Sequence, residues 1–153
     1  MSSAILNSTQ DGFETKQLVV NDFGYNQGWR NDKHLRLLDD RVAGDYNVKD
    51  IIGFKDNNVY VSKGNDDGTF EAPQLWLANA FGYNQGWRVG RDKRMLFDVN
   101  DDGYKDIVGF KNDQIYVSLN NNGTSFLDPQ LWLKDFKEDF AFLIPILSIL
   151  SGD

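Results

Sequence analysis

The sequence predicts an all-β protein built from two tandem copies of a four-stranded repeat, and three observations support this class. The motif FGYNQGWR occurs at Phe23–Arg30 and again at Phe81–Arg88. Short runs rich in β-branched and aromatic residues follow each copy, separated by Asn- and Gly-rich turns, as is typical of strands. No segment before residue 137 has the apolar periodicity of an α-helix over three turns.

The repeat continues downstream of the shared motif in the same order. All four tryptophans fall in matched pairs, Trp29 with Trp87 and Trp76 with Trp132. Such self-similarity at a fixed period is the signature of a repeat architecture. The other matched segments are Asp50–Phe54 with Asp106–Phe110, Val59–Ser62 with Ile115–Ser118, and Pro73–Leu77 with Pro129–Leu133.

Each copy is expected to form four short strands. The dipeptide Asn122-Gly123 is a turn signal between the third strand and the fourth. Four strands in roughly 40–50 residues are typical of one blade of a β-propeller. In the second copy the expected strands are Arg94–Phe97, Asp106–Phe110, Gln114–Leu119 and Gln130–Leu133.

The repeat divides the chain into four parts. We assign residues 1–22 to a partial repeat that supplies a closing strand, 23–80 to the first blade, 81–136 to the second, and 137–153 to an atypical apolar tail. A propeller usually needs about 4–8 blades to close. We therefore expect a homo-oligomer in which other chains complete the ring, and favour three chains with about six blades in all. A piece of a longer propeller is the alternative.

The composition argues against several classes of function. The net charge of -7 and the pI of 4.6 disfavour nucleic acid as a partner, because its phosphates would be repelled. The absence of cysteine excludes thiol catalysis, and with one histidine and no nucleophile motif we expect no enzyme. Because the strongly apolar stretch Phe140–Leu150 is too short to cross a bilayer, we expect no membrane span, and we expect no signal peptide because the first residues lack a basic start and an apolar run. A cytoplasmic location is the default, with non-classical release as the alternative.

An acidic loop in the second copy, DVNDDGYKD, predicts a calcium site. Oxygen-bearing residues alternate along it, and Gly103 allows the bend that turns them toward one cation. The alternative is an Asx-rich turn whose carboxylates cap backbone amides without a metal. The loop Asp40–Asp50 of the first copy is longer and lacks the alternation, so we expect it to bind calcium poorly or not at all. The predicted ligands of a structural Ca²⁺ are Asp98, Asn100, Asp102, the Tyr104 carbonyl and Asp106.

The repeated FGYNQGWR motif combines the groups that recognise sugars, namely aromatic faces, planar amides and a guanidinium. Two copies without a catalytic partner are typical of multivalent binding. The alternative is that the aromatic residues belong to the core, which we expect for Phe23, Phe81, Trp76 and Trp132. The candidate sugar-binding residues are Tyr25, Asn26, Gln27, Trp29 and Arg30 in the first copy, and Tyr83, Asn84, Gln85, Trp87 and Arg88 in the second.

Together these motifs resemble the FG-GAP/VCBS-type repeats of the Psathyrella velutina lectin family, over about residues 12–136. The resemblance implies a β-propeller that binds N-acetylglucosamine-type glycans, and in some members also sialylated ones, between consecutive blades, with calcium in its acidic loops. It adds Lys33, His34 and Arg36 to the first pocket, although the charged neighbours of His34 alone predict a surface or rim position. The alternative function is a calcium-stabilised structural or protein-adhesion module that binds no sugar.

Overall fold

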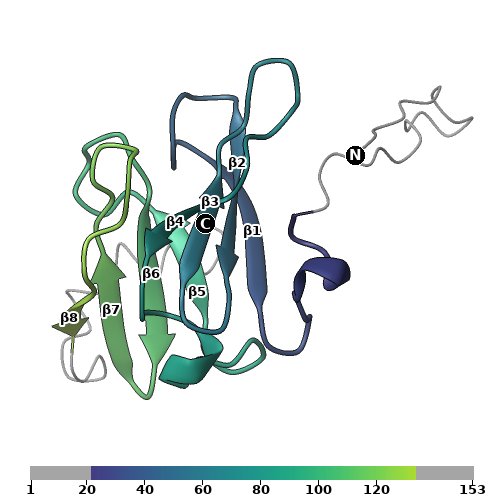
Figure 1. Cartoon of the computed structure of the whole chain (residues 1–153). Helices are drawn as coiled ribbons and strands as arrows, with labels where there is room; N and C mark the ends of the chain where they lie inside the picture. The colour runs from purple at the N-terminus through teal and green to yellow at the C-terminus, as the bar shows by residue number, and fades with distance from the viewer. Residues whose placement is uncertain (1–21, 134–153) are drawn as a thin grey trace, which may run out of the picture.

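The computed structural model describes residues 22–133, which form two four-stranded antiparallel sheets (Figure 1). The strand orders are β1-β2-β3-β4 and β5-β6-β7-β8, so each sheet is a meander of consecutive strands. A short 3-10 helix precedes each sheet. The elements are η1 (Tyr25–Gln27), β1 (Leu35–Asp40), β2 (Lys49–Phe54), β3 (Val59–Ser62), β4 (Gln74–Leu77), η2 (Tyr83–Gln85), β5 (Arg94–Phe97), β6 (Asp106–Lys111), β7 (Gln114–Ser118) and β8 (Gln130–Leu133).

The predicted all-β class is confirmed, and the strands lie where the repeat placed them. β5 and β8 have the predicted bounds, whereas β6 extends to Lys111 and β7 ends at Ser118. The 3-10 helices were not predicted because three residues are too few for a periodic signal. Within residues 22–133 no helix is long and apolar enough to cross a membrane. The predicted tail and, apart from Asp22, the predicted partial repeat lie outside the described residues.

The two sheets repeat each other in register as well as in sequence. Gly53 pairs with Tyr60 in the first sheet, and Gly109 pairs with Tyr116 in the second. The pairing between the last two strands shifts directly before each of these tyrosines. Matched positions of the two repeats therefore have corresponding partners in the strand pairing of their own sheets.

One apolar core joins the two sheets. Trp76 from β4 meets Phe126 with ring centroids 5.3 Å apart, and Phe54 from β2 meets Phe81 at 6.3 Å, both edge to face. Burying a side chain of the size of Phe contributes about 1.5–3 kcal/mol, so this shared core couples the sheets. Of the predicted core aromatics, the structure buries Phe23, Phe81 and Trp76 and leaves Trp132 half-buried.

Polar contacts also cross between the sheets. The buried amide of Asn120 donates from Nδ2 to the backbone oxygen of Val42 at 2.9 Å. The ammonium of Lys105, in the loop before β6, pairs with the carboxylate of Asp39 and lies 3.0 Å from Oδ1 of Asp40. Because a buried donor left without its acceptor is costly, these contacts favour a single arrangement of the two sheets.

Candidate functional site

Each FGYNQGWR motif forms the same tight loop, whose shape is set by a glycine. Gly28 and Gly86 end the two 3-10 helices with φ of 84° and 87°, a left-handed conformation that side chains rarely adopt. Their N–H groups donate to the carbonyls of Tyr25 and Tyr83, both at 3.0 Å. This turn directs the next residue, a tryptophan, back beneath the loop.

Trp87 points inward from the loop and is 5% exposed. Its ring lies 5.1 Å from that of Phe81 and covers Gly109 of β6. The fit is tight, since a Cβ at Gly109 would lie 2.5 Å from the Trp87 ring and 2.8 Å from that of Phe81. Trp29 occupies the same place over Gly53 and is 4% exposed. Both tryptophans predicted to bind sugar are therefore core residues as well.

The arginine that ends each motif is held within its own loop. Nη1 of Arg88 donates to the carbonyls of Tyr83 at 2.8 Å and of Trp87 at 3.0 Å. Its guanidinium carbon also lies 3.8 Å from the centroid of the Tyr83 ring. Arg30 makes the corresponding contacts in the first copy. These arginines stabilise the loops, so their Nη1 groups are already occupied by backbone carbonyls.

His34 is buried, so the surface or rim position predicted for it is wrong. It is 4% exposed, its Nδ1 accepts the backbone N–H of Arg30 at 2.9 Å, and its Nε2 lies 2.9 Å from Oδ1 of Asp56. Asp92 occupies this position in the second copy, and its Oδ2 accepts the N–H of Arg88 at 2.9 Å. The position requires an acceptor beneath the loop, a role that the charged neighbours in the sequence did not reveal.

Arg94 in β5 is a buried cation that the sequence did not single out. It is 3% exposed, and burial lowers the pKa of its guanidinium to about 10. Its Nη1 donates to the carbonyl of Phe81 at 2.7 Å, but its Nε and Nη2 have no hydrogen-bond partner among residues 22–133. In the first copy the corresponding Arg36 donates to Asn31. Val89 stands at that asparagine's position in the second copy, which removes the partner.

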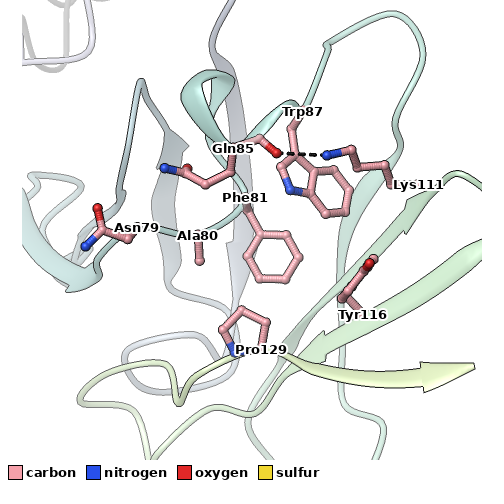
Figure 2. A pocket seen from close by; sticks show the side chains of 8 residues that line it. All are labelled: Asn79, Ala80, Phe81, Gln85, Trp87, Lys111, Tyr116 and Pro129. Carbon is pink, nitrogen blue, oxygen red and sulfur yellow. Dashed lines mark hydrogen bonds between the residues drawn. The ribbon is translucent and has the colours of Figure 1, made fainter.

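A pocket of about 230 Å³ lies beside Trp87, where the segment after β4 meets the second sheet (Figure 2). Figure 2 shows the rings of Phe81, Trp87 and Tyr116 around this space, with Pro129 at one side. Aromatic surface of this kind suits the C–H face of a sugar ring. The lining residues are Asn79, Ala80, Phe81, Gln85, Trp87, Lys111, Tyr116 and Pro129.

The polar groups of the pocket are held in place by the protein. Nζ of Lys111 donates to the backbone oxygen of Gln85 at 2.8 Å and lies 5.4 Å from the centroid of the Trp87 ring (Figure 2). The hydroxyl of Tyr116 donates to Oε1 of Gln114 at 2.6 Å and keeps its own lone pairs as acceptors. An ammonium and a phenol thus lie at the aromatic wall, and both can form hydrogen bonds with hydroxyl groups.

Two of the predicted sugar-binding amides connect the two sheets. Nδ2 of Asn84 and Nε2 of Gln85 both donate to Oδ1 of Asn57, at 3.1 and 3.2 Å. Asn57 lies in the hairpin turn Lys55–Asn58 of the first sheet, whose backbone carbonyls accept N–H groups from the same loop. The loop that contains η2 is therefore docked on the first sheet.

Of the predicted sugar-binding residues, the pocket is lined by Gln85 and Trp87. Lys111, Tyr116 and Pro129 line it too and were missed, although each recurs in the first copy. That recurrence was the signal that could have identified them, because the polar and aromatic residues that the second copy contributes to the pocket are all identical in the first copy. Their counterparts in the first copy are Lys55, Tyr60 and Pro73.

The acidic loop brings three of its five predicted calcium ligands together. Oδ1 of Asp98 accepts the backbone N–H of Asp102 at 3.1 Å, and Oδ2 accepts that of Gly103 at 2.8 Å. The amide of Asn100 lies between the two carboxylates; turned nitrogen-inward it donates to Oδ1 of Asp98 at 3.0 Å and to Oδ1 of Asp102 at 3.1 Å. Turned the other way, it places three oxygens together, which is the arrangement a cation favours.

Asp106 lies apart from this group. It is fully buried, with Oδ2 accepting the N–H of Val99 and Oδ1 that of Asn120, both at 2.8 Å. Burial, with the charges of Asp98 and Asp102 nearby, raises the pKa of its carboxyl to about 6. Asp50 of the first sheet accepts two backbone N–H groups in the same way, those of Ala43 and Gly64, so the structural role of this position is common to both copies. Its metal role, like that of the Tyr104 carbonyl, stays a prediction.

Among the described residues no three His, Asp or Glu side chains gather as a metal site, so Asn100 is needed to complete the set. In the first copy, Asp40 stands at the position of Asp98 and is engaged by lysines. Its Oδ2 accepts from Lys49 at 3.2 Å, and the hydrogen bond from Lys105 lowers the pKa of its carboxyl to about 2. These ammonium groups occupy the place where a cation would have to bind.

The fold is similar to that of a lectin from Agrocybe aegerita, whose structure describes specific recognition of non-reducing terminal N-acetylglucosamine. The TM-score is 0.71 and the sequence identity 30%, over 88% of this chain. The chain spans 38% of the length of that lectin. No protein-family model and no curated protein matches the sequence. The predicted resemblance to a lectin is thus supported in the fold, over a part of the lectin's length.

Proposed function

We propose that this chain is a carbohydrate-binding lectin module that recognises N-acetylglucosamine-type glycans and does not convert them chemically. The observation that carries the proposal is the aromatic pocket at Trp87, in a fold similar to that of an N-acetylglucosamine-binding lectin. A volume of about 230 Å³ suits one terminal sugar residue better than a long oligosaccharide. Several chains that each present one such pocket would together bind glycans multivalently. Sialylated glycans are included among the proposed ligands.

Each side of the pocket has a distinct role in this proposal. The rings of Trp87 and Tyr116 offer apolar surface to the sugar, and Pro129 adds a rigid edge. The ammonium of Lys111 donates to a sugar oxygen, and the side chain of Asn79 supplies an amide from the facing segment. Hydrogen bonds to a charged group contribute about 1.5–3 kcal/mol, so Lys111 is expected to carry much of the polar affinity.

Lys111→Met tests this site, with Lys55→Met as its matched control. The two lysines make the same local contacts: Nζ of Lys55 donates to the carbonyl of Gln27 at 2.8 Å and lies 5.2 Å from the Trp29 ring centroid. Calorimetric titration with a chitin disaccharide is expected to show a loss of about tenfold or more for Lys111→Met, since 1.4 kcal/mol is tenfold. The control is expected to retain the wild-type affinity. Equal losses in both variants, or no binding by the folded wild type, would refute the assignment.

We also propose that Asp98, Asn100 and Asp102 hold a structural Ca²⁺. The support is the convergence of their side chains, with the Asn100 amide between the two carboxylates, because hard oxygen ligands suit this ion and the amide can turn its oxygen toward it. A ligand that binds only the folded state raises the free energy of unfolding, by about 2.7 kcal/mol at a concentration one hundred times its Kd, and therefore raises the melting temperature. Asp102→Asn is expected to abolish the calcium-dependent rise in melting temperature. Asp67→Asn, in another exposed turn, is expected to leave it unchanged, and a rise that survives Asp102→Asn would exclude this site.

A further inference from the structure

We propose that Asn57, which does not line the pocket, is a positioning residue of the sugar site: it holds the Gln85 amide so that an N–H donor serves the ligand. The group that this donor recognises is a carbonyl oxygen, such as that of an acetamido substituent. The inference rests on the proposed function and adds to it the ligand group that Gln85 recognises. Because Asn57 belongs to the first repeat and Trp87 to the second, the site depends on both repeats.

The Gln85 side chain is held by two hydrogen bonds that fix the direction of its amide. Its Oε1 accepts the backbone N–H of Gly82 at 3.0 Å. Because a backbone N–H can only donate, the atom that faces it must be the amide oxygen. Nε2 therefore lies on the other side of the amide, where it donates to Oδ1 of Asn57 at 3.2 Å. The two contacts together determine where the amide donates and where it accepts.

The acceptor on Asn57 is determined in the same way. Its Oδ1 receives Nδ2 of Asn84 at 3.1 Å as well as Nε2 of Gln85. A carbonyl oxygen has two lone pairs, so both bonds can form at once. The backbone oxygen of Asn57 accepts the N–H of Ala80 at 3.0 Å. Asn57 thus contacts two residues that line the pocket, Ala80 and Gln85, from outside it.

One hydrogen of the Gln85 amide remains for a ligand. The NH2 group has two donors, and the contact with Asn57 uses one of them. The ammonium of Lys111, held at the backbone oxygen of Gln85 at 2.8 Å, supplies further donors. Figure 2 shows the Gln85 side chain extending toward Asn79 and away from Lys111, so the two donor groups lie on different sides of the pocket. Donors on two sides suit a ligand oxygen that accepts without donating, which describes a carbonyl oxygen.

The chain offers a conservative substitution for Asn57, since aspartate (Asp113) stands at its position in the second repeat. A carboxylate accepts hydrogen bonds as the amide oxygen does. Asn57→Asp is therefore expected to keep Gln85 in place, whereas Asn57→Ala removes the acceptor. Because Asn57 is exposed and its backbone bond to Ala80 remains in both variants, both chains are expected to fold.

Calorimetric titration with a chitin disaccharide tests the positioning role. Asn57→Ala is expected to raise the Kd about three- to tenfold, the effect of one lost hydrogen bond, and Asn57→Asp to restore the wild-type Kd. The matched control is Asn65→Ala, because Nδ2 of Asn65 donates to Oγ1 of Thr69 at 3.0 Å in a turn away from the pocket. This control is expected to keep the wild-type Kd. An unchanged Kd for Asn57→Ala, or equal losses for Asn57→Ala and Asn57→Asp, would overturn the proposal.

A second substitution, Gln85→Ala, decides whether Asn57 acts through the Gln85 amide. In a chain that already lacks this amide, Asn57→Ala is expected to change the Kd by less than about twofold, because nothing remains for Asn57 to position. A merely structural role of Asn57 would weaken binding by the same factor with and without Gln85. Equal factors in the two backgrounds would therefore also overturn the proposal.

A measurement without sugar separates this inference from the proposed function. In the NMR spectrum of the free wild-type chain, the side-chain amide signals of Gln85 are expected to differ from those of a free glutamine, and to move to the free values in Asn57→Ala. Free values in the wild type would overturn the positioning role, whether or not the chain binds sugar. A held amide in a chain that binds no sugar would instead overturn the proposed function, and with it the ligand group named for this donor.

Discussion

Replacing Gly109 by alanine is expected to weaken sugar binding by reshaping the pocket from beneath. The added Cβ would lie 2.5 Å from Cη2 of Trp87 and 2.8 Å from Cε1 of Phe81, whereas ordinary contact begins at 3.4 Å. Both rings line the pocket, so the methyl group fits only if they move by up to about 1 Å, which is overpacking.

The magnitude follows from the two contacts that must give way. Overpacking of this size costs about 1–3 kcal/mol of folding free energy. Aromatic contacts contribute about 0.5–1.5 kcal/mol, so a displaced Trp87 is expected to raise the Kd for an N-acetylglucosamine ligand about three- to tenfold. The loss of stability and the loss of affinity are measured separately, by urea unfolding and by calorimetric titration.

Gly53→Ala provides the matched control. Its Cβ would lie 2.3 Å from Cη2 of Trp29 and 2.8 Å from Cε1 of Phe23, so the overlap is similar but lies away from the pocket. We expect this variant to lose a similar amount of stability and to keep the wild-type Kd. Gly90→Ala, whose Cβ meets nothing within 4 Å, is expected to change neither quantity.

Two results would refute this reasoning, provided that both variants are folded at the temperature of the titration. An equal rise in Kd for Gly53→Ala and Gly109→Ala would show that affinity follows general stability. An unchanged Kd for a destabilised Gly109→Ala would show that the sugar does not contact this wall.

Three further predictions concern stability and are checked by urea unfolding. Asn120→Ala leaves two backbone carbonyls without their donor and is expected to cost about 2–4 kcal/mol, whereas exposed Asn121→Ala should stay within about 0.5 kcal/mol of wild type; equal values would contradict the role of the inter-sheet bond. Val89→Asn supplies a partner for the buried guanidinium of Arg94 and should stabilise by about 1 kcal/mol; a loss of stability would show that the asparagine does not reach it. Because the pKa of Asp40 is about 2 in the folded chain and 3.8 for an ordinary aspartate, its stabilisation is complete above pH 3.8 and is lost as the pH falls toward 2. Asp40→Asn should reduce this acid-induced loss of unfolding free energy by up to about 2 kcal/mol. An unchanged loss would show that other carboxylates cause it.

The fold was accessible from the sequence because the repeat itself supplied the alignment. The matched motifs placed the four strands of the second sheet to within a residue at each end, since β-branched runs and turn residues recur at the same positions. The burial of His34 was missed because it depends on an acceptor role that only the spatial neighbour Arg30 reveals. The pairing of Lys105 with Asp39 was equally inaccessible, since it joins the two copies.

The candidate site was predicted less well, for a physical reason. A polar aromatic motif looks the same whether its side chains face a ligand or a neighbouring sheet. Asn84 contacts the first sheet, and Arg88 braces its own loop. Lys111 and Tyr116 come from strands that packing alone brings to the pocket.

The identity of the two loops also bears on how the chain reaches its folded state. The turn Lys55–Asn58 accepts η2 largely through backbone groups, which η1 of a neighbouring molecule presents equally well. Tethering gives a chain's own loop an effective concentration on the order of millimolar, so dilute molecules are expected to pair internally. In concentrated refolding the foreign loop competes, and domain-swapped chains become kinetic traps. Slow dilution from denaturant is therefore expected to raise the yield of the folded chain.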